Sequence, residues 1–186
     1  MKNSHLFLIF LIVFFSFSCS LHYMQGENSE GSIPEFSFKN ARYTKYEANK
    51  KNISLVAGQL EQYKVDNKIF AKDVSFEAFG SDGETETSGE CQLLAANTKK
   101  ENYTLFGNIQ LFLPKQEMQI FAASLNFNKR NEQLVSASDS EVVLKKKDVS
   151  LSGYGFSASG VSRAFSFSGA VSGVIHSDDG DSSDEN

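Results

Sequence analysis

Apolar and polar residues alternate along most of the chain, from Phe36 to Ile175. A period of two places every second side chain on the same face of a β-strand, so this pattern predicts strands. In the clearest run one face is almost wholly apolar and comprises Tyr103, Leu105, Gly107, Ile109, Leu111 and Leu113. Similar runs occupy residues 53–57, 74–78, 121–127 and 165–175. No comparable helical stripe occurs outside the amino-terminal segment, and we therefore expect an all-β fold.

Short clusters of turn-forming residues separate these runs. They lie at residues 65–68, 80–83, 97–102, 113–117 and 128–132. Asn, Asp and Gly tolerate turn dihedrals, and their spacing predicts about eight or nine rather long antiparallel strands.

The first 18 residues have the features of a signal peptide: Lys2, an apolar run from Leu6 to Phe15, and then small residues. This run is about half of the roughly 20 residues that a membrane-spanning helix needs. We expect Cys19 to be acylated as the mature first residue and residues 19–33 to form a flexible tether. The alternatives are ordinary cleavage nearby or a disulfide between Cys19 and Cys91.

Acidic residues are concentrated at the carboxy terminus. The net charge of the chain is −5, and five acids lie in residues 177–186, which we expect to be a disordered tail. The body, residues 34–176, is then almost balanced and is expected to form one domain. It has no basic face that would bind a phosphate backbone, so we expect no nucleic-acid partner.

A short unit in which strand formers bracket a glycine recurs at residues 105–109, 151–156 and 167–171. Glycine within a strand often marks a sharp bend, so the repetition predicts a folded-over sheet with an apolar trough inside. The inward apolar residues are the candidates to line this trough: Leu55, Val74, Phe76, Leu93, Leu105, Ile109, Leu111, Phe121, Leu125, Phe127, Phe156, Phe165 and Phe167.

Residues for catalysis or metal binding are poorly placed. The three histidines, His5, His22 and His176, all lie outside the strand-forming region or at its very end. The acids of the tail lack the spacing of a calcium loop. We therefore expect no catalytic residue, no metal and no cofactor. The run 145–147 of three lysines is either a patch for acidic lipid headgroups or an ordinary charged turn.

An ordered series of segments resembles the LptC family, the periplasmic bridge component of lipopolysaccharide export with its OstA-like domain. The segments are residues 67–76, 89–95, 105–109, 120–127 and 151–156, and the resemblance spans about residues 36–175. The family is usually anchored by an uncleaved helix, and the short run before Cys19 instead indicates a lipoprotein variant. Phe127 stands where the family often has Trp or Tyr.

The resemblance implies a β-jellyroll whose apolar interior holds acyl chains. It also implies edge-to-edge pairing with inner-membrane ABC transporter components at one end and a periplasmic bridge protein at the other. The last predicted strand, residues 163–175, has no Lys or Pro after Arg163, which favours a paired edge. The candidates for this pairing are Gly153, Gly155, Phe165, Phe167, Gly169 and Val171.

Two functions follow as hypotheses. In the first, an exported protein, anchored through Cys19 to the periplasmic face of a membrane, binds a lipid or lipopolysaccharide-like glycolipid and passes it to a partner. In the second, it is a structural or adhesive envelope lipoprotein with a closed β-sandwich and no lipid cargo.

Overall fold

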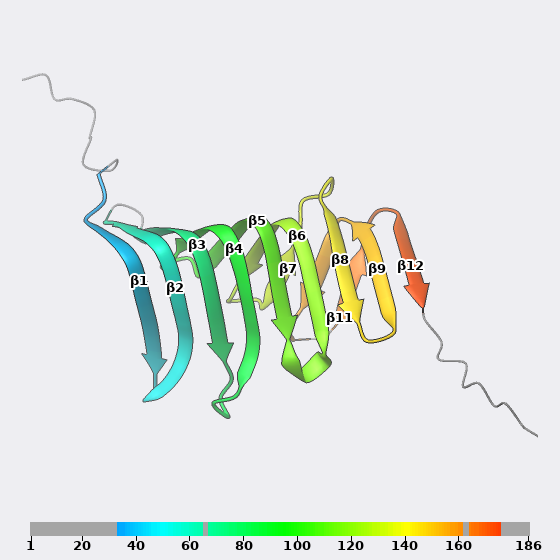
Figure 1. Cartoon of the computed structure of the whole chain (residues 1–186), viewed down its shortest axis with the longest axis horizontal. Helices are drawn as coiled ribbons and strands as arrows, with labels where there is room; N and C mark the ends of the chain where they lie inside the picture. Colours follow the sequence, from blue (N-terminus) through cyan, green and yellow to red (C-terminus); the bar gives the residue numbers. More distant parts are fainter. Residues whose placement is uncertain (1–32, 65–66, 162–163, 176–186) are drawn as a thin grey trace, which may run out of the picture.

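The computed structural model describes residues 33–64, 67–161 and 164–175, which form an all-β fold around one antiparallel sheet of twelve strands (Figure 1). The strands are β1 (Phe36–Glu47), β2 (Lys50–Tyr63), β3 (Lys68–Phe79), β4 (Thr85–Asn97), β5 (Asn102–Leu113), β6 (Met118–Asn128), β7 (Gln133–Val135), β8 (Glu141–Lys146), β9 (Val149–Tyr154), β10 (Phe156–Ser159), β11 (Ala164–Phe167) and β12 (Val171–Ile175). A short 3-10 turn, η3 (Pro114–Gln116), joins β5 to β6. The predicted signal peptide, Cys19 with most of the tether, and the acidic tail lie outside the described residues.

The sheet is continuous through β1 to β6 and then divides. Each of the first six strands pairs with the next in sequence. One part of β6 pairs with β7 and the other part with β8. From there the sheet continues along two paths, β7–β10–β11 and β8–β9–β12.

A line of unpaired residues crosses the first six strands at the level where the sheet divides. The residues skipped in the pairing are Asn40, Gly58, Asp73, Gln92, Gly107 with Asn108, and Ala123. Several of them have positive φ: 50° at Asn40, 52° at Asp73 and 73° at Gly107. Gly, Asn and Asp adopt this conformation at the lowest cost. The pairing keeps its register across these residues from β1 to β4, and it shifts on both sides of β5, where Gly107 and Asn108 form a bulge that bends the strand. The aligned unpaired residues form a corner along which the whole sheet folds over.

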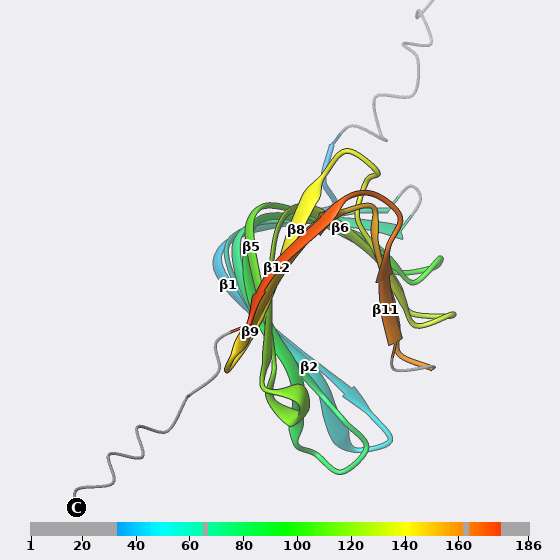
Figure 2. The ribbon, with the colours of Figure 1, turned by 90° about the vertical axis from the view of Figure 1, so that its right-hand side faces the viewer.

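The fold-over produces two arms that face each other (Figure 2). The β12 arm contains β8, β9, β12 and the parts of β1–β6 on their side of the corner, and the β11 arm contains β7, β10, β11 and the remaining parts. In the view of Figure 2, β11 stands opposite β9 and β12. Among the described residues the sheet does not close on itself, so within that part of the chain it has a free edge at β1 and others at β11 and β12.

The corner also explains how both arms turn apolar side chains inward. In β2, β3, β4 and β6 the core residues that flank the corner are three or five positions apart, so the alternation changes face there. In β4, Cys91 is buried on one side of the corner, whereas Leu94, not Leu93, packs against the core on the other side. A single core therefore fills the angle between the arms. It comprises Leu55, Ala57, Leu60, Ala71, Val74, Cys91, Leu105, Ile109, Leu111, Ile120, Leu125, Val142, Leu144 and Phe156.

The folded-over all-β architecture is confirmed, but the sheet has twelve strands where eight or nine long ones were expected. The difference arises after β6, where strands are three to six residues long. The expected last strand is two strands, because the chain leaves the sheet at Ser168–Ala170 before β12 begins. These strands end at the corner because the chain turns there instead of passing through a bulge.

Candidate functional site: the inner face of the folded sheet

The inner face is apolar from one edge of the sheet to the other. In the β12 arm, one row of paired residues crosses eight strands and comprises Leu55, Phe76, Gly89, Leu111, Ile120, Leu144, Leu151 and Gly173. In the β11 arm, the facing row comprises Leu60, Ala71, Leu94, Leu105 and Leu125 and continues at Phe156 and Phe167. The inner face thus has the chemistry that was predicted for the trough.

The middle of this face is tightly packed. Ile109, Leu125 and Phe156 are each 1 % exposed, Ile120 is 2 % exposed and Val142 is fully buried. These side chains belong to β5, β6, β8 and β10, so they come from both arms. The central part of the trough is consequently filled by the protein's own side chains.

Toward the two ends the inner face remains open to solvent. On β1, Phe38 pairs with Leu60 and Tyr43 pairs with Leu55, yet they are 52 % and 44 % exposed. On the other side, Phe165 of β11 is 45 % exposed. The apolar surface therefore runs out onto both edges of the sheet.

Several inner-face residues at these ends were missed by the sequence analysis. They are Phe36, Phe38 and Tyr43 at the β1 end and Ile175 at the β12 end. Phe36 and Phe38 are two residues apart, which was an available signal, but the unpaired Asn40, with φ of 50°, interrupts the alternation along β1. The interruption hid the fact that these aromatic residues share a face with Tyr43.

Charged side chains from the two arms meet at the β1 end of the mouth, the opening between the free ends of the arms. Glu47 ends β1 in the β12 arm, and its Oε1 accepts hydrogen bonds from Lys45 Nζ at 2.6 Å and from Lys129 Nζ at 3.4 Å. Lys129 follows β6 in the β11 arm. The bonds from Lys45 and Lys129 lower the pKa of the Glu47 carboxyl, and burial raises the pKa of the nearby Tyr103 phenol. The ion pair between Glu47 and Lys129 therefore bridges the mouth at this end.

Two predicted trough residues, Leu93 and Phe121, lie on the outer face. Leu93 is 50 % exposed and pairs with Phe106, which is also exposed. Phe121 pairs with Gln110, while its neighbour Ile120 is the buried residue. Both predictions were wrong for the same reason: the alternation changes face at the unpaired residues Gln92 in β4 and Ala123 in β6, so it cannot be extended through the corner.

The other eleven candidates lie on the inner face, although not equally deeply. Leu55, Val74, Leu105, Ile109, Leu111, Leu125 and Phe156 belong to the buried core, and Phe76 and Phe167 pack against it. Phe127 lies on the same face, where its ring is 6.2 Å from that of Tyr103. Phe165 is the exposed member of the set.

The residues predicted to pair with a partner at the carboxy-terminal edge are distributed over several strands. Phe165 and Phe167 lie in β11 and Val171 lies in β12, which are edge strands. Gly153 lies in β9, between β8 and β12, and is buried. Gly155, with φ of 63°, and Gly169 lie at the breaks between strands. Only the residues of β11 and β12 offer main-chain groups at a free edge.

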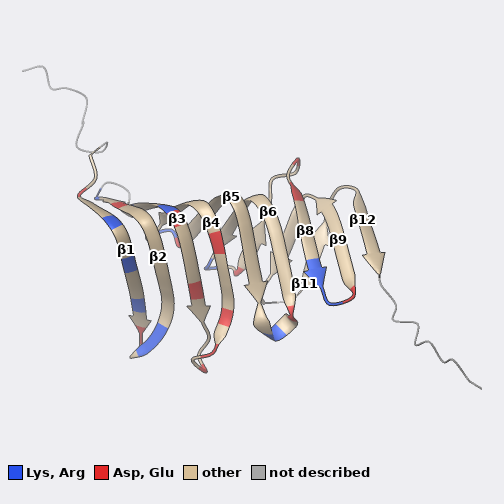
Figure 3. Ribbon diagram, in the orientation of Figure 1, with Lys and Arg blue, Asp and Glu red and all other residues tan. Residues whose placement is uncertain are grey.

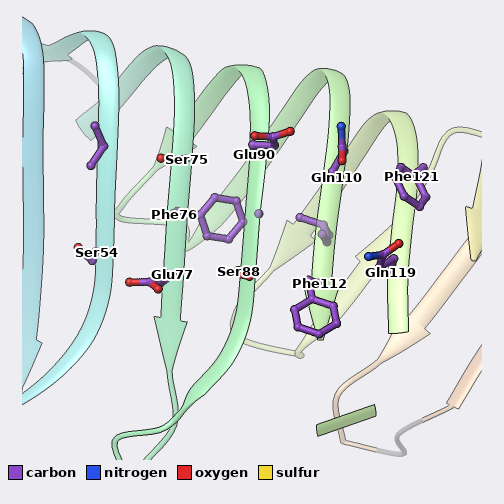
Figure 4. A pocket seen from close by; sticks show the side chains of 13 residues that line it. Ser54, Ser75, Phe76, Glu77, Ser88, Glu90, Gln110, Phe112, Gln119 and Phe121 are labelled. Carbon is purple, nitrogen blue, oxygen red and sulfur yellow. The ribbon is translucent and has the colours of Figure 1, made fainter. Parts of the chain in front are cut away.

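A shallow hollow of about 450 Å³ lies on the outer face across β2–β6 (Figure 4). Its lining mixes polar and aromatic side chains, including Glu77, Glu90, Gln110, Phe112 and Phe121. Figure 4 shows these side chains in two rows across the strands, which are the residues that alternate with the buried ones. Phe76 and Leu111 of the inner-face row also border this hollow, beside Gly89, which has no side chain.

The described residues contain no group of three or more His, Cys, Asp or Glu side chains that would hold a metal ion. Cys91 is a free, buried thiol, and burial raises its pKa to about 11, which keeps it protonated and unreactive. In the described part of the chain, no helix is long and apolar enough to cross a membrane.

No protein-family model matches the chain, and no curated protein matches it either.

Proposed function

We propose that the protein binds a lipid or glycolipid of the lipopolysaccharide type along the inner face of its folded sheet and passes it to a partner. The observation that supports this most is the continuous inner apolar face, which stays exposed at both ends of an open sheet. Burying acyl chains there would contribute about 0.8 kcal/mol per methylene group.

The free edges suit the partners that this function requires. An edge strand offers unpaired main-chain donors and acceptors, and a partner strand that pairs with it would extend the apolar face. On this proposal β1 faces one partner and β11 with β12 faces the other, an inner-membrane ABC transporter component and a periplasmic bridge protein. The protein would work at the periplasmic face of the membrane, held by acylated Cys19.

The packed middle of the inner face limits how cargo is held. Because Ile109, Leu125 and Phe156 fill the centre, acyl chains either lie against the exposed ends or enter when the arms move apart. This packing is also the observation that favours the second candidate function, a structural or adhesive envelope lipoprotein. A protein of that kind would be stabilised by a filled core and would carry no lipid.

The decisive experiment uses a pair of phenylalanines with matched exposure on opposite faces. Phe165 lies on the inner face and is 45 % exposed, whereas Phe106 lies on the outer face and is 43 % exposed. A photoreactive benzoylphenylalanine is incorporated at either position in the full chain, expressed in its native envelope and irradiated. We expect a lipid or glycolipid adduct, identified by mass spectrometry, from position 165 and not from position 106.

Equal adducts at both positions would indicate nonspecific contact with membrane lipid, and no adduct at position 165 would favour the structural function. The anchor is tested separately by mass spectrometry of the mature amino terminus. An unmodified, soluble protein would rule out acylation of Cys19.

A further inference from the structure

Three consecutive lysines, Lys145, Lys146 and Lys147, form a basic surface at the turn between β8 and β9, visible as the blue segment of β8 in Figure 3. They border a hollow of about 540 Å³ that Phe112, Gln119 and Val149 also line. The Lys145 ammonium lies 5.1 Å from the centre of the Phe121 ring. The lysines are therefore grouped around one hollow and not spread along a strand.

These lysines differ from several others in the described ranges because they have no ion-pair partner there. Lys45 and Lys129 contact Glu47, and Lys115 contacts Asp82. No described carboxylate lies within ion-pair distance of the three lysines, although Glu117 lines the same hollow. Asp148 follows the lysines in the same turn, so with Glu117 the surface has three positive and two negative side chains and a small excess of positive charge.

The chain beyond β12 supplies the opposite charge close to this surface. Ile175, the last residue of β12, pairs with Val149, which in turn pairs with Lys146. Ile175 is thus two strands away from Lys146, or about 10 Å. The following residues, 176–186, contain five acids and neither Lys nor Arg. A segment of this length reaches up to about 35 Å when extended, so its acids are within reach of the lysines.

We propose that the acidic segment 176–186 docks on the lysine surface at the β8–β9 turn. Each exposed ion pair is weak, but several pairs act together, and the covalent connection gives the segment a local concentration of about millimolar. The segment would run back across the end of β9 toward β8. The outer edge of β12 would then stay uncovered.

The test is zero-length carbodiimide cross-linking of the full chain, purified in detergent at low salt, followed by mass spectrometry. Lys99 and Lys100 in the β4–β5 turn are an internal control, because they are also consecutive and exposed but lie in the other arm. We expect cross-links from the acids of the segment to residues 145–147 to exceed those to residues 99–100 by about fivefold, and to fall at 0.5 M salt through screening.

Two variants complete the test. Replacing Lys145, Lys146 and Lys147 by Gln should not raise cross-linking at residues 99–100, and replacing the five acids by Asn or Gln should make residues 145–147 more reactive toward an acylating reagent. Equal cross-linking at both lysine groups would overturn the proposal. So would binding of phosphatidylglycerol vesicles to the lysine surface that is the same with the acidic and the neutralised segment, because the segment would then not cover it.

Discussion

The change of face at the corner leads to a quantitative prediction for Leu125 and Leu93, both of which alternation alone places on the inner face. Leu125 is 1 % exposed in the core, whereas Leu93 is 50 % exposed on the outer face. Leu125→Ala removes three buried carbon groups at about 0.8 kcal/mol each and leaves a cavity, so the expected loss of unfolding free energy is about 3–4 kcal/mol. For Leu93→Ala, half of the side chain is already in water and no closed cavity forms, so the expected loss is about 1 kcal/mol or less.

Urea unfolding measures this difference. With a slope of about 2 kcal/mol per M, the midpoints of the two variants should differ by about 1–1.5 M. Leu94→Ala provides a further comparison, because Leu94 is the neighbour that packs against the core, and its effect should lie between the other two. If Leu93→Ala destabilised the protein as much as Leu125→Ala, Leu93 would have to lie in the core. The exchange of faces at the corner would then be refuted.

Three further predictions concern the corner, the buried thiol and the mouth. Gly107→Ala should lower the free energy of unfolding by about 1–3 kcal/mol, because φ is 73° and an added Cβ would collide with the Gln92 side chain. This loss would appear as a lower urea midpoint, and an unchanged midpoint would contradict it. Since burial raises the pKa of Cys91 from 9.0 to about 11, the stability that the protonated thiol contributes is complete below pH 9 and is lost as the pH rises through 11. Native protein at pH 8 should accordingly react with a thiol reagent far more slowly than urea-unfolded protein, and equal rates would show that the thiol is accessible. Glu47→Gln should weaken the contact with Lys129 and widen the distance between spin labels on the β1–β2 and β6–β7 turns. Because the pKa of Glu47 is lowered, acid should reproduce this widening only at a pH below the usual pKa range of a carboxyl group. An unchanged distance would show that the ion pair does not hold the mouth.

The sequence predicts the strands well because their alternation is a local property. Leu105, Ile109 and Leu111 are buried as expected, and the turns at residues 80–83 and 113–117 lie between strands. The recurring glycines also indicated bends, and Gly107 and Gly155 do lie at the corner with positive φ. These features depend on nearest neighbours along the chain.

The faces of Leu93 and Phe121 could not be predicted, because they depend on which residues are skipped in pairing. Nothing in the sequence around Gln92 or Ala123 distinguishes an unpaired residue from a regular strand position. The unpaired residues become evident only when neighbouring strands are aligned, since each lies beside the next across the sheet. For the same reason the ion pair between Glu47 and Lys129, 82 residues apart, has no local signal.

The alignment of the unpaired residues at the corner has a consequence for how a fold of this kind can change in size. Each of the first six strands passes through the corner at the same level, so each adjacent pair forms a similar transverse section of the molecule. Adding one hairpin of this design would lengthen the molecule by about 10 Å and leave its section unchanged. Width is thus set by the number of residues per strand and length by the number of strands, so insertion or loss of whole hairpins can adjust one dimension without disturbing the other.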